Sequence, residues 1–152
     1  MSYLLNTFLL VFIVSISSVS IAQTNNQKAT FDEVQKETND LMQALESYSK
    51  SKSESAIEDV DAALERTDQR IEALESRIDD EWDETTESAR KEARENLKQL
   101  RQKRLEVAKW YGGLLNSTAE SWDYMKKGFS KAYNDLQRYW EKSQKEFSSK
   151  NK

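Results

Sequence analysis

No proline interrupts this chain of 152 residues, and it contains only three glycines. Proline stops or kinks a helix because it lacks an N–H group and clashes with the preceding turn, so its absence permits long unbroken helices. Charged residues make up 33% of the chain, and Glu, Lys and Arg are good helix formers. The sequence therefore predicts an all-α protein, with turns at Gly112-Gly113 and at clusters of Ser, Thr and Asn.

The chain also lacks cysteine and histidine. Thiolate nucleophiles, imidazole bases and the usual zinc ligands are therefore missing. Carboxylates are abundant, but a helix surface offers no enclosed pocket that would separate their pKa values for acid–base chemistry. The acidic run that begins at Asp79 lacks the glycine that an EF-hand loop needs at its sixth position. We expect a protein that is not an enzyme and that uses no metal or cofactor.

The first 22 residues differ from the rest, because no charge occurs from Leu4 to Ala22. An apolar run that ends in small residues, here Ser20-Ile21-Ala22, is typical of a secretory signal peptide. We expect cleavage after Ala22, a disordered N-terminus over residues 23–30, and a mature chain that is periplasmic or secreted. The run has no Lys or Arg before it and is just long enough to span about 30 Å of hydrocarbon. An anchor formed by an uncleaved N-terminal helix is therefore the alternative.

Two heptad patterns follow the polar N-terminus. The first starts at a capping box that begins at Thr30, and it predicts a helix over residues 31–48. The second starts at another capping box at Ser55 and predicts a helix over residues 55–111, with a candidate bend where its seam weakens at residues 79–95. The coiled-coil seam of this second helix consists of Ile57, Val60, Leu64, Ile71, Leu74 and Ile78.

A basic aromatic amphipathic helix is predicted over residues 118–148. Its apolar positions repeat every eleven residues, which corresponds to about 3.67 residues per turn and keeps them on one face of a straight helix. Residues 31–96 carry 21 acidic and 9 basic groups, whereas residues 97–152 carry 6 acidic and 13 basic groups. We predict that the basic half makes the contact with a partner or a membrane, through Tyr111, Leu114, Trp122, Met125, Lys126, Lys127, Phe129, Lys131, Tyr133, Leu136, Arg138, Trp140 and Phe147.

Two interpretations of this aromatic face remain open. In the first, the last helix packs on the preceding helix and buries its Trp and Phe rings in a core. In the second, the rings and the flanking Lys and Arg side chains lie at the headgroup boundary of an anionic membrane. The two interpretations are compatible with each other if the helical bundle can open and expose this aromatic face.

The aromatic segment also carries a resemblance. Residues 121–133 read SWDYMKKGFSKAY and are followed by Leu136 and Trp140. This pattern resembles the C-terminal repeat of bacterial exported coiled-coil proteins, which are described as stress-response or apolipoprotein-like helical proteins of the envelope. The match lies mainly over residues 118–147. The resemblance implies an envelope location and an association with stress responses, and it supplies no defined active site.

The expected architecture is a long helical hairpin or an elongated three-helix coiled-coil bundle with residues 55–111 as its spine. Such a thin core favours homo-oligomerisation. A turn at Gly112-Gly113 would place the last helix on residues 82–111, so we expect the acidic surface of residues 54–87 to lie out of its reach. The predicted function is a structural or adaptor role through self-association or another envelope protein, without nucleic acid. The alternative is apolipoprotein-like binding to anionic membrane surfaces.

Overall fold

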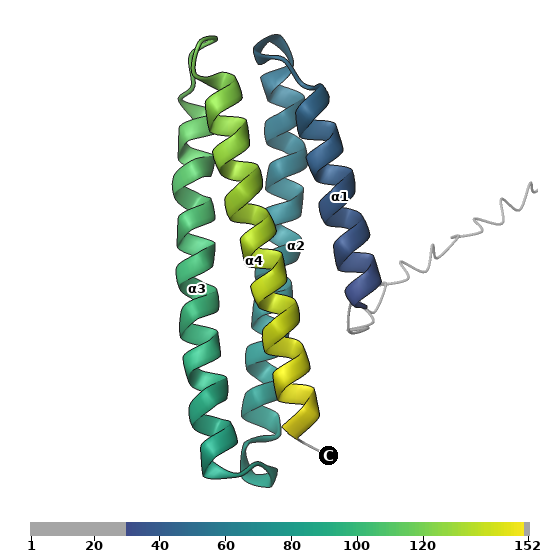
Figure 1. Cartoon of the computed structure of the whole chain (residues 1–152), viewed down its shortest axis with the longest axis vertical. Helices are drawn as coiled ribbons and strands as arrows, with labels where there is room; N and C mark the ends of the chain where they lie inside the picture. Colours follow the sequence, from purple (N-terminus) through teal and green to yellow (C-terminus); the bar gives the residue numbers. More distant parts are fainter. Residues whose placement is uncertain (1–29, 151–152) are drawn as a thin grey trace, which may run out of the picture.

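A computed structural model describes residues 30–150 of the chain, and every regular element over this range is helical. Four helices run alternately up and down as an elongated bundle (Figure 1). The all-α class is therefore confirmed. The signal peptide and disordered N-terminus that we predicted for residues 1–29 lie outside the described residues. The helices are α1 (Phe31–Ser47), α2 (Ser53–Asp80), α3 (Glu87–Leu115) and α4 (Trp122–Lys150), with short 3-10 helices η1 (Lys50–Lys52) and η2 (Trp82–Glu84) in the first two connections.

Helix α1 begins at the capping box that the sequence predicts. The Thr30 N–H donates to Glu33 Oε2 at 2.7 Å, and the Glu33 N–H donates to Thr30 Oγ1 at 3.3 Å. These bonds satisfy two backbone donors that the first turn of a helix leaves free. The second predicted box is not used, because α2 begins at Ser53 and its N-cap residue Lys52 makes no side-chain capping bond.

The single helix predicted over residues 55–111 is wrong, because the chain folds back on itself at residues 81–86. Thr86 has an extended backbone, and its hydroxyl accepts a bond from the Ala89 N–H at 3.2 Å. It is therefore the N-cap of a new helix, α3. The weak seam that we interpreted as a candidate bend contains the turn between two antiparallel helices.

The turn expected at Gly112-Gly113 is also wrong, because α3 runs through both glycines and ends at Leu115. A Cβ atom on Gly113 would lie only 2.6 Å from Met125 Sδ on α4, so the missing side chain lets the two helices approach. The turn itself follows at residues 116–121. There the Asn116 side-chain amide donates to the Gly112 carbonyl at 2.8 Å and helps to end α3.

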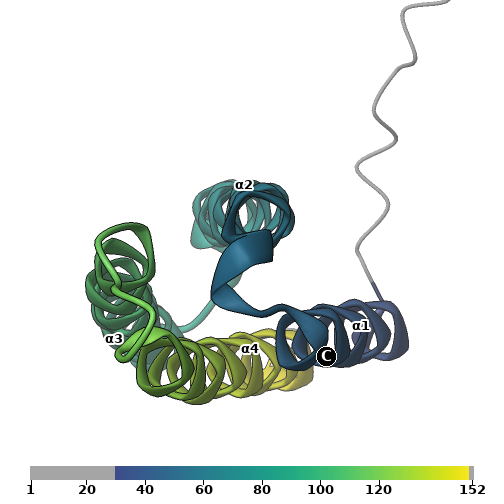
Figure 2. The same cartoon turned by 90° about the horizontal axis from the view of Figure 1, so that it is seen from above.

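Helix α4 lies in the middle of the bundle, with α3 on one side, α1 on the other and α2 across from it (Figure 2). The α3–α4 pair is the most closely packed. The core between the helices contains Val34, Leu41, Leu45, Val60, Leu64, Ile71, Leu74, Ile78, Leu97, Leu100, Val107, Leu114, Trp122, Phe129, Tyr133, Leu136, Trp140 and Phe147, among others.

Helix α1 has 17 residues and covers only part of the bundle, since the other three helices have 28 or 29 (Figure 1). Near the α2–α3 turn, Arg77 of α2 closes the side that α1 does not reach. Its guanidinium lies 4.7 Å from the ring centroid of Phe147 and donates to Gln144 Oε1 at 2.8 Å. A cation over an aromatic face and a bond to an amide thus connect α2 to α4.

Candidate contact surface

The predicted seam of α2 faces the interior of the bundle. Four of its positions, Val60, Leu64, Leu74 and Ile78, are at most 5% exposed, and Ile71 is 7% exposed. Ile57 is half-buried. In this structure the seam therefore contacts the other helices of the same chain.

The aromatic residues predicted to contact a partner lie in the core of the closed bundle. Trp122 donates its indole N–H to the Tyr48 carbonyl at 3.0 Å, and the rings of Phe129 and Tyr133 stack with centroids 5.7 Å apart. Because α4 has neighbours on three sides, its apolar face is covered. The buried members of the predicted set are Leu114, Trp122, Phe129, Tyr133, Leu136, Trp140 and Phe147, while Tyr111 and Met125 are half-buried.

The basic residues of the predicted set fall into two groups. Lys126 is not a surface residue, because its side chain is only 13% exposed and its ammonium donates to the Tyr48 carbonyl at 2.7 Å. Tyr48 is the C-cap of α1, and a positive charge at that end of a helix is favourable. Lys127, Lys131 and Arg138 are exposed. Arg138 is paired with Asp135 on its own helix.

Charge is divided between the two helical hairpins. Residues 31–84, which include α1 and α2, carry 18 acidic and 6 basic groups, a net charge of −12. Residues 87–150, which include α3 and α4, carry 9 acidic and 15 basic groups, a net charge of +6. The molecule is therefore a rod with one acidic and one basic hairpin, and opposite potentials on two faces favour electrostatic association.

The two hairpins meet through ion pairs between α2 and α3. Arg104 binds Asp68 with two bonds, of 2.6 and 2.8 Å, and Arg101 pairs with Glu75. The last helix, which we expected to lie out of reach of the acidic surface of residues 54–87, also reaches this surface, since Gln137 of α4 donates to Thr67 of α2. The fold at residues 81–86 is the physical reason, because it returns α3 along α2.

A buried polar cluster lies between α2 and α4. Thr67 Oγ1 donates to the Ala63 carbonyl at 2.9 Å and accepts from Gln137 Nε2 at 2.9 Å. Its only hydrogen is used, so the Tyr133 hydroxyl donates the third bond, at 3.2 Å. Gln137 Oε1 is buried without a partner. The interface between α2 and α4 is therefore partly polar, and one of its buried polar atoms lacks a hydrogen-bond partner.

Four tyrosines titrate above the ordinary tyrosine range. Burial and a hydrogen bond to Asp61 raise the pKa of Tyr111 to about 12. A hydrogen bond to Asp59 raises the pKa of Tyr48, and burial raises the pKa of Tyr133 and of Tyr139. The first three bond to acceptors on α2 and link that helix to α1, α3 and α4.

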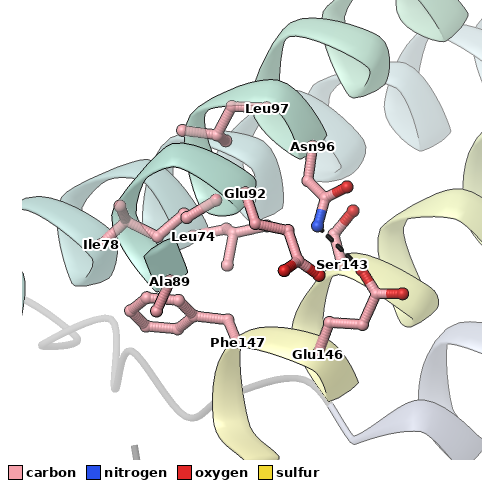
Figure 3. A pocket seen from close by; sticks show the side chains of 10 residues that line it. Leu74, Ile78, Ala89, Glu92, Asn96, Leu97, Ser143, Glu146 and Phe147 are labelled. Carbon is pink, nitrogen blue, oxygen red and sulfur yellow. Dashed lines mark hydrogen bonds between the residues drawn. The ribbon is translucent and has the colours of Figure 1, made fainter. Parts of the chain in front are cut away.

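A small hollow between α2, α3 and α4 is shown in Figure 3. Its apolar side includes Ile78 and Phe147, and at its polar side Asn96 Nδ2 donates to Glu146 Oε2 at 2.8 Å. The cavity has a volume of about 10 Å³. That is room for one water molecule and not for a ligand.

Within residues 30–150, no three acidic side chains lie close enough together to hold a metal ion. No helix in the same range combines the length and the apolar character that crossing a membrane requires.

Exposed apolar residues on the α2–α3 side and on the outer α3–α4 face were not predicted from the sequence. Leu105 is 63% exposed and Leu115 is 47% exposed. Tyr124, 65% exposed, meets Trp110 edge to face with centroids 5.7 Å apart. A leucine outside the apolar seam of an otherwise charged run, as at position 105, is the signal that would have revealed this surface.

No known protein family, curated protein or solved structure matches this chain.

Proposed function

We propose that this chain is a non-enzymatic helical protein of the cell envelope that acts by electrostatic contact. In this proposal it is a structural or adaptor protein that associates with copies of itself or with another envelope protein. The observation that carries the proposal is the division of charge into an acidic α1–α2 hairpin and a basic α3–α4 hairpin. Such a rod is complementary to itself, because the basic face of one copy fits the acidic face of another.

The charges left on the surface support association. The ion pairs Arg101–Glu75 and Arg104–Asp68 connect the hairpins but use few of their charged groups. Lys127 and Lys131 on α4 are exposed, and so are Glu65 and Glu72 on α2. Exposed charges of opposite sign on separate faces raise the rate of encounter and select the orientation of the partner.

The proposed location rests on the leader-like residues 1–22, and the association with stress responses rests on the resemblance of residues 118–147. Purification of the exported protein followed by N-terminal sequencing tests the location. A mature chain that begins at Gln23 supports export with cleavage. An intact Met1 in the membrane fraction would favour the anchor instead.

Sedimentation velocity of the protein that begins at Gln23 tests self-association. We expect a larger species at about 0.01 M salt, where the Debye length is about 30 Å, and its loss at about 1 M salt, where that length falls to about 3 Å. Circular dichroism at both salt concentrations controls for unfolding. A single monomeric species at low salt, at every protein concentration, would contradict self-association.

A second candidate function is apolipoprotein-like binding to an anionic membrane surface. The specific observation that favours it is the polar interface around Thr67 and Gln137, because an interface with an unsatisfied buried oxygen is less costly to open than an apolar one. If α1–α2 moves away from α3–α4, the buried rings of α4 form one apolar face flanked by lysines.

Tryptophan fluorescence with vesicles tests this second function. Trp122 and Trp140 are each 2% exposed, so a quencher placed in the lipid tails reaches them only if the bundle opens on the membrane. We expect quenching with anionic vesicles and none with zwitterionic vesicles. Equal fluorescence in both vesicle types would reject membrane binding by opening.

A further inference from the structure

The outer side of the α2–α3 pair has an open groove with a volume of about 460 Å³. Its two walls come from different helices and carry opposite charge. The α2 wall contributes Glu75 and Asp79, and the α3 wall contributes Arg94, Lys98 and Arg101, with Leu105 also on the α3 side.

Some charges of this groove have no partner within the described chain. Glu75 and Arg101 form an ion pair across the groove. One helical turn closer to the α2–α3 connection, Asp79 and Lys98 are both exposed, and neither forms an ion pair with another of residues 30–150. An acidic and a basic group at the same level of the bundle are thus available to a partner.

The side of α3 beyond the groove is apolar and uncovered. Leu105, Ala108, Gly112 and Leu115 follow Arg101 at steps of four and three residues, which keeps them on one side of the helix. Leu105 and Leu115 are 63% and 47% exposed. A Cβ atom on Gly112 would meet nothing within 4 Å, so the surface there is open.

We infer that this α2–α3 face binds the same face of a second copy of the chain, related by a two-fold axis parallel to the helices. The inference rests on the self-association proposed above and specifies its surface. A rotation about such an axis places α2 of each copy over α3 of the other at the same level. The acidic wall then faces a basic wall twice, and the exposed leucines are covered by the second copy.

The alternative two-fold arrangement is unfavourable. An axis in the interface but perpendicular to the helices would place α2 over α2 and α3 over α3. Acidic residues would then face acidic residues and basic residues would face basic residues, and like charges brought together in an interface repel each other. The charge pattern therefore selects the parallel axis, in which Asp79 of one copy lies opposite Lys98 of the other.

Charge reversal with mixing tests the arrangement. Asp79→Lys puts two lysines opposite each other in a dimer of the variant, and Lys98→Asp puts two aspartates opposite each other. We expect each variant alone to associate roughly tenfold more weakly or worse than the wild type in sedimentation at low salt. An equimolar mixture restores opposite charges at both contacts, so we expect it to form the dimer again.

Lys142→Asp is the matched control, because it makes the same change of net charge as Lys98→Asp at an exposed side chain of α4 that does not belong to the contact surface described above. We expect this variant to dimerise, and circular dichroism verifies that all variants fold. If Asp79→Lys and Lys98→Asp associate as the wild type does, or if their mixture does not recover, the proposed face is wrong although salt-sensitive self-association stands. A wild-type chain that stays monomeric at low salt would instead reject self-association together with this face.

Discussion

The ring of Trp110 on α3 lies against Gly128 on α4, so close that a side chain on residue 128 would overlap the ring. A similar contact joins Met125 on α4 to Gly113 on α3. Glycine inside a helix costs about 0.5 to 1 kcal/mol relative to alanine. Here that cost is offset by the close approach of α3 and α4, which is the tightest helix pair of the bundle.

The three glycines should therefore respond differently to alanine. Gly128→Ala forces the rigid Trp110 ring to move, and we expect a loss of stability of about 1–3 kcal/mol. Gly112→Ala enters open space on a regular helix, and we expect a gain of up to about 1 kcal/mol. Gly113→Ala should lie between them, because the flexible Met125 side chain can move aside.

Urea unfolding at high salt measures these three differences without a contribution from self-association. If Gly128→Ala were as stable as Gly112→Ala, the close α3–α4 contact would not exist as described.

The polar cluster between α2 and α4 supplies a second prediction. Thr67→Val leaves the Gln137 amide and the Tyr133 hydroxyl without their shared partner, and we expect a loss of about 1–3 kcal/mol. Gln137→Leu removes both this amide and the unsatisfied Oε1 oxygen, so it should be close to neutral or stabilising. In the Gln137→Leu background, Thr67→Val should cost less than it does alone.

A double-mutant cycle from thermal or urea unfolding gives the coupling between these two positions. Additive effects would mean that the two side chains do not interact.

The sequence predicts the parts of the fold that depend on local chemistry. The start of α1 follows from the hydroxyl of Thr30 and the carboxylate of Glu33, which meet within one turn. The turn at residues 81–86 was not predicted as a fold-back, because it contains no Gly or Pro and only the hydroxyl of Thr86 signals the new helix. At Gly112-Gly113 the glycines predicted a turn where the helix in fact continues, because glycine inside a helix can also serve close packing against a neighbouring helix.

The candidate surface was harder to predict than the helices. The eleven-residue repeat of α4 identifies an apolar face but not the neighbour that covers it. That neighbour depends on the topology, because the unpredicted turn at residues 81–86 returns α3 along α2 and both helices then pack against α4. The same turn brings Asp68 and Arg104 into contact and places Asp79 and Lys98 beside one groove.

The raised tyrosine pKa values predict a loss of stability in alkali. The neutral Tyr111 phenol donates to Asp61, and its pKa is about 12 in the folded chain against an ordinary value of 10.0. The stabilisation is therefore complete below pH 10.0 and declines as the pH rises towards about 12, because the unfolded chain loses the proton first. The pKa values of Tyr48, Tyr133 and Tyr139 are shifted in the same direction.

Urea unfolding at a series of alkaline pH values, with tyrosinate absorbance as a second readout, measures this decline. We expect Tyr111→Phe to be less stable than the wild type at neutral pH, because the bond to Asp61 is lost, and to decline less steeply above pH 10.0. An identical slope in both proteins would show that Tyr111 is not linked to folding.

The last prediction separates two neighbouring lysines that the sequence alone cannot distinguish. Lys126→Glu places a carboxylate beside the Tyr48 carbonyl at the negative end of α1, where the ammonium now donates at 2.7 Å. We expect a loss of about 1–3 kcal/mol in urea unfolding at high salt, because a part-buried carboxylate would then face a carbonyl oxygen, which cannot donate a bond to it. Lys127→Glu changes an exposed side chain by the same charge and should alter stability by less than about 0.5 kcal/mol.

Lys126→Met, which keeps most of the apolar stem, should be less destabilising than Lys126→Glu. If Lys126→Glu and Lys127→Glu were equally stable, the ammonium of Lys126 would not cap α1, and both lysines would belong to the exposed contact surface that the sequence suggests.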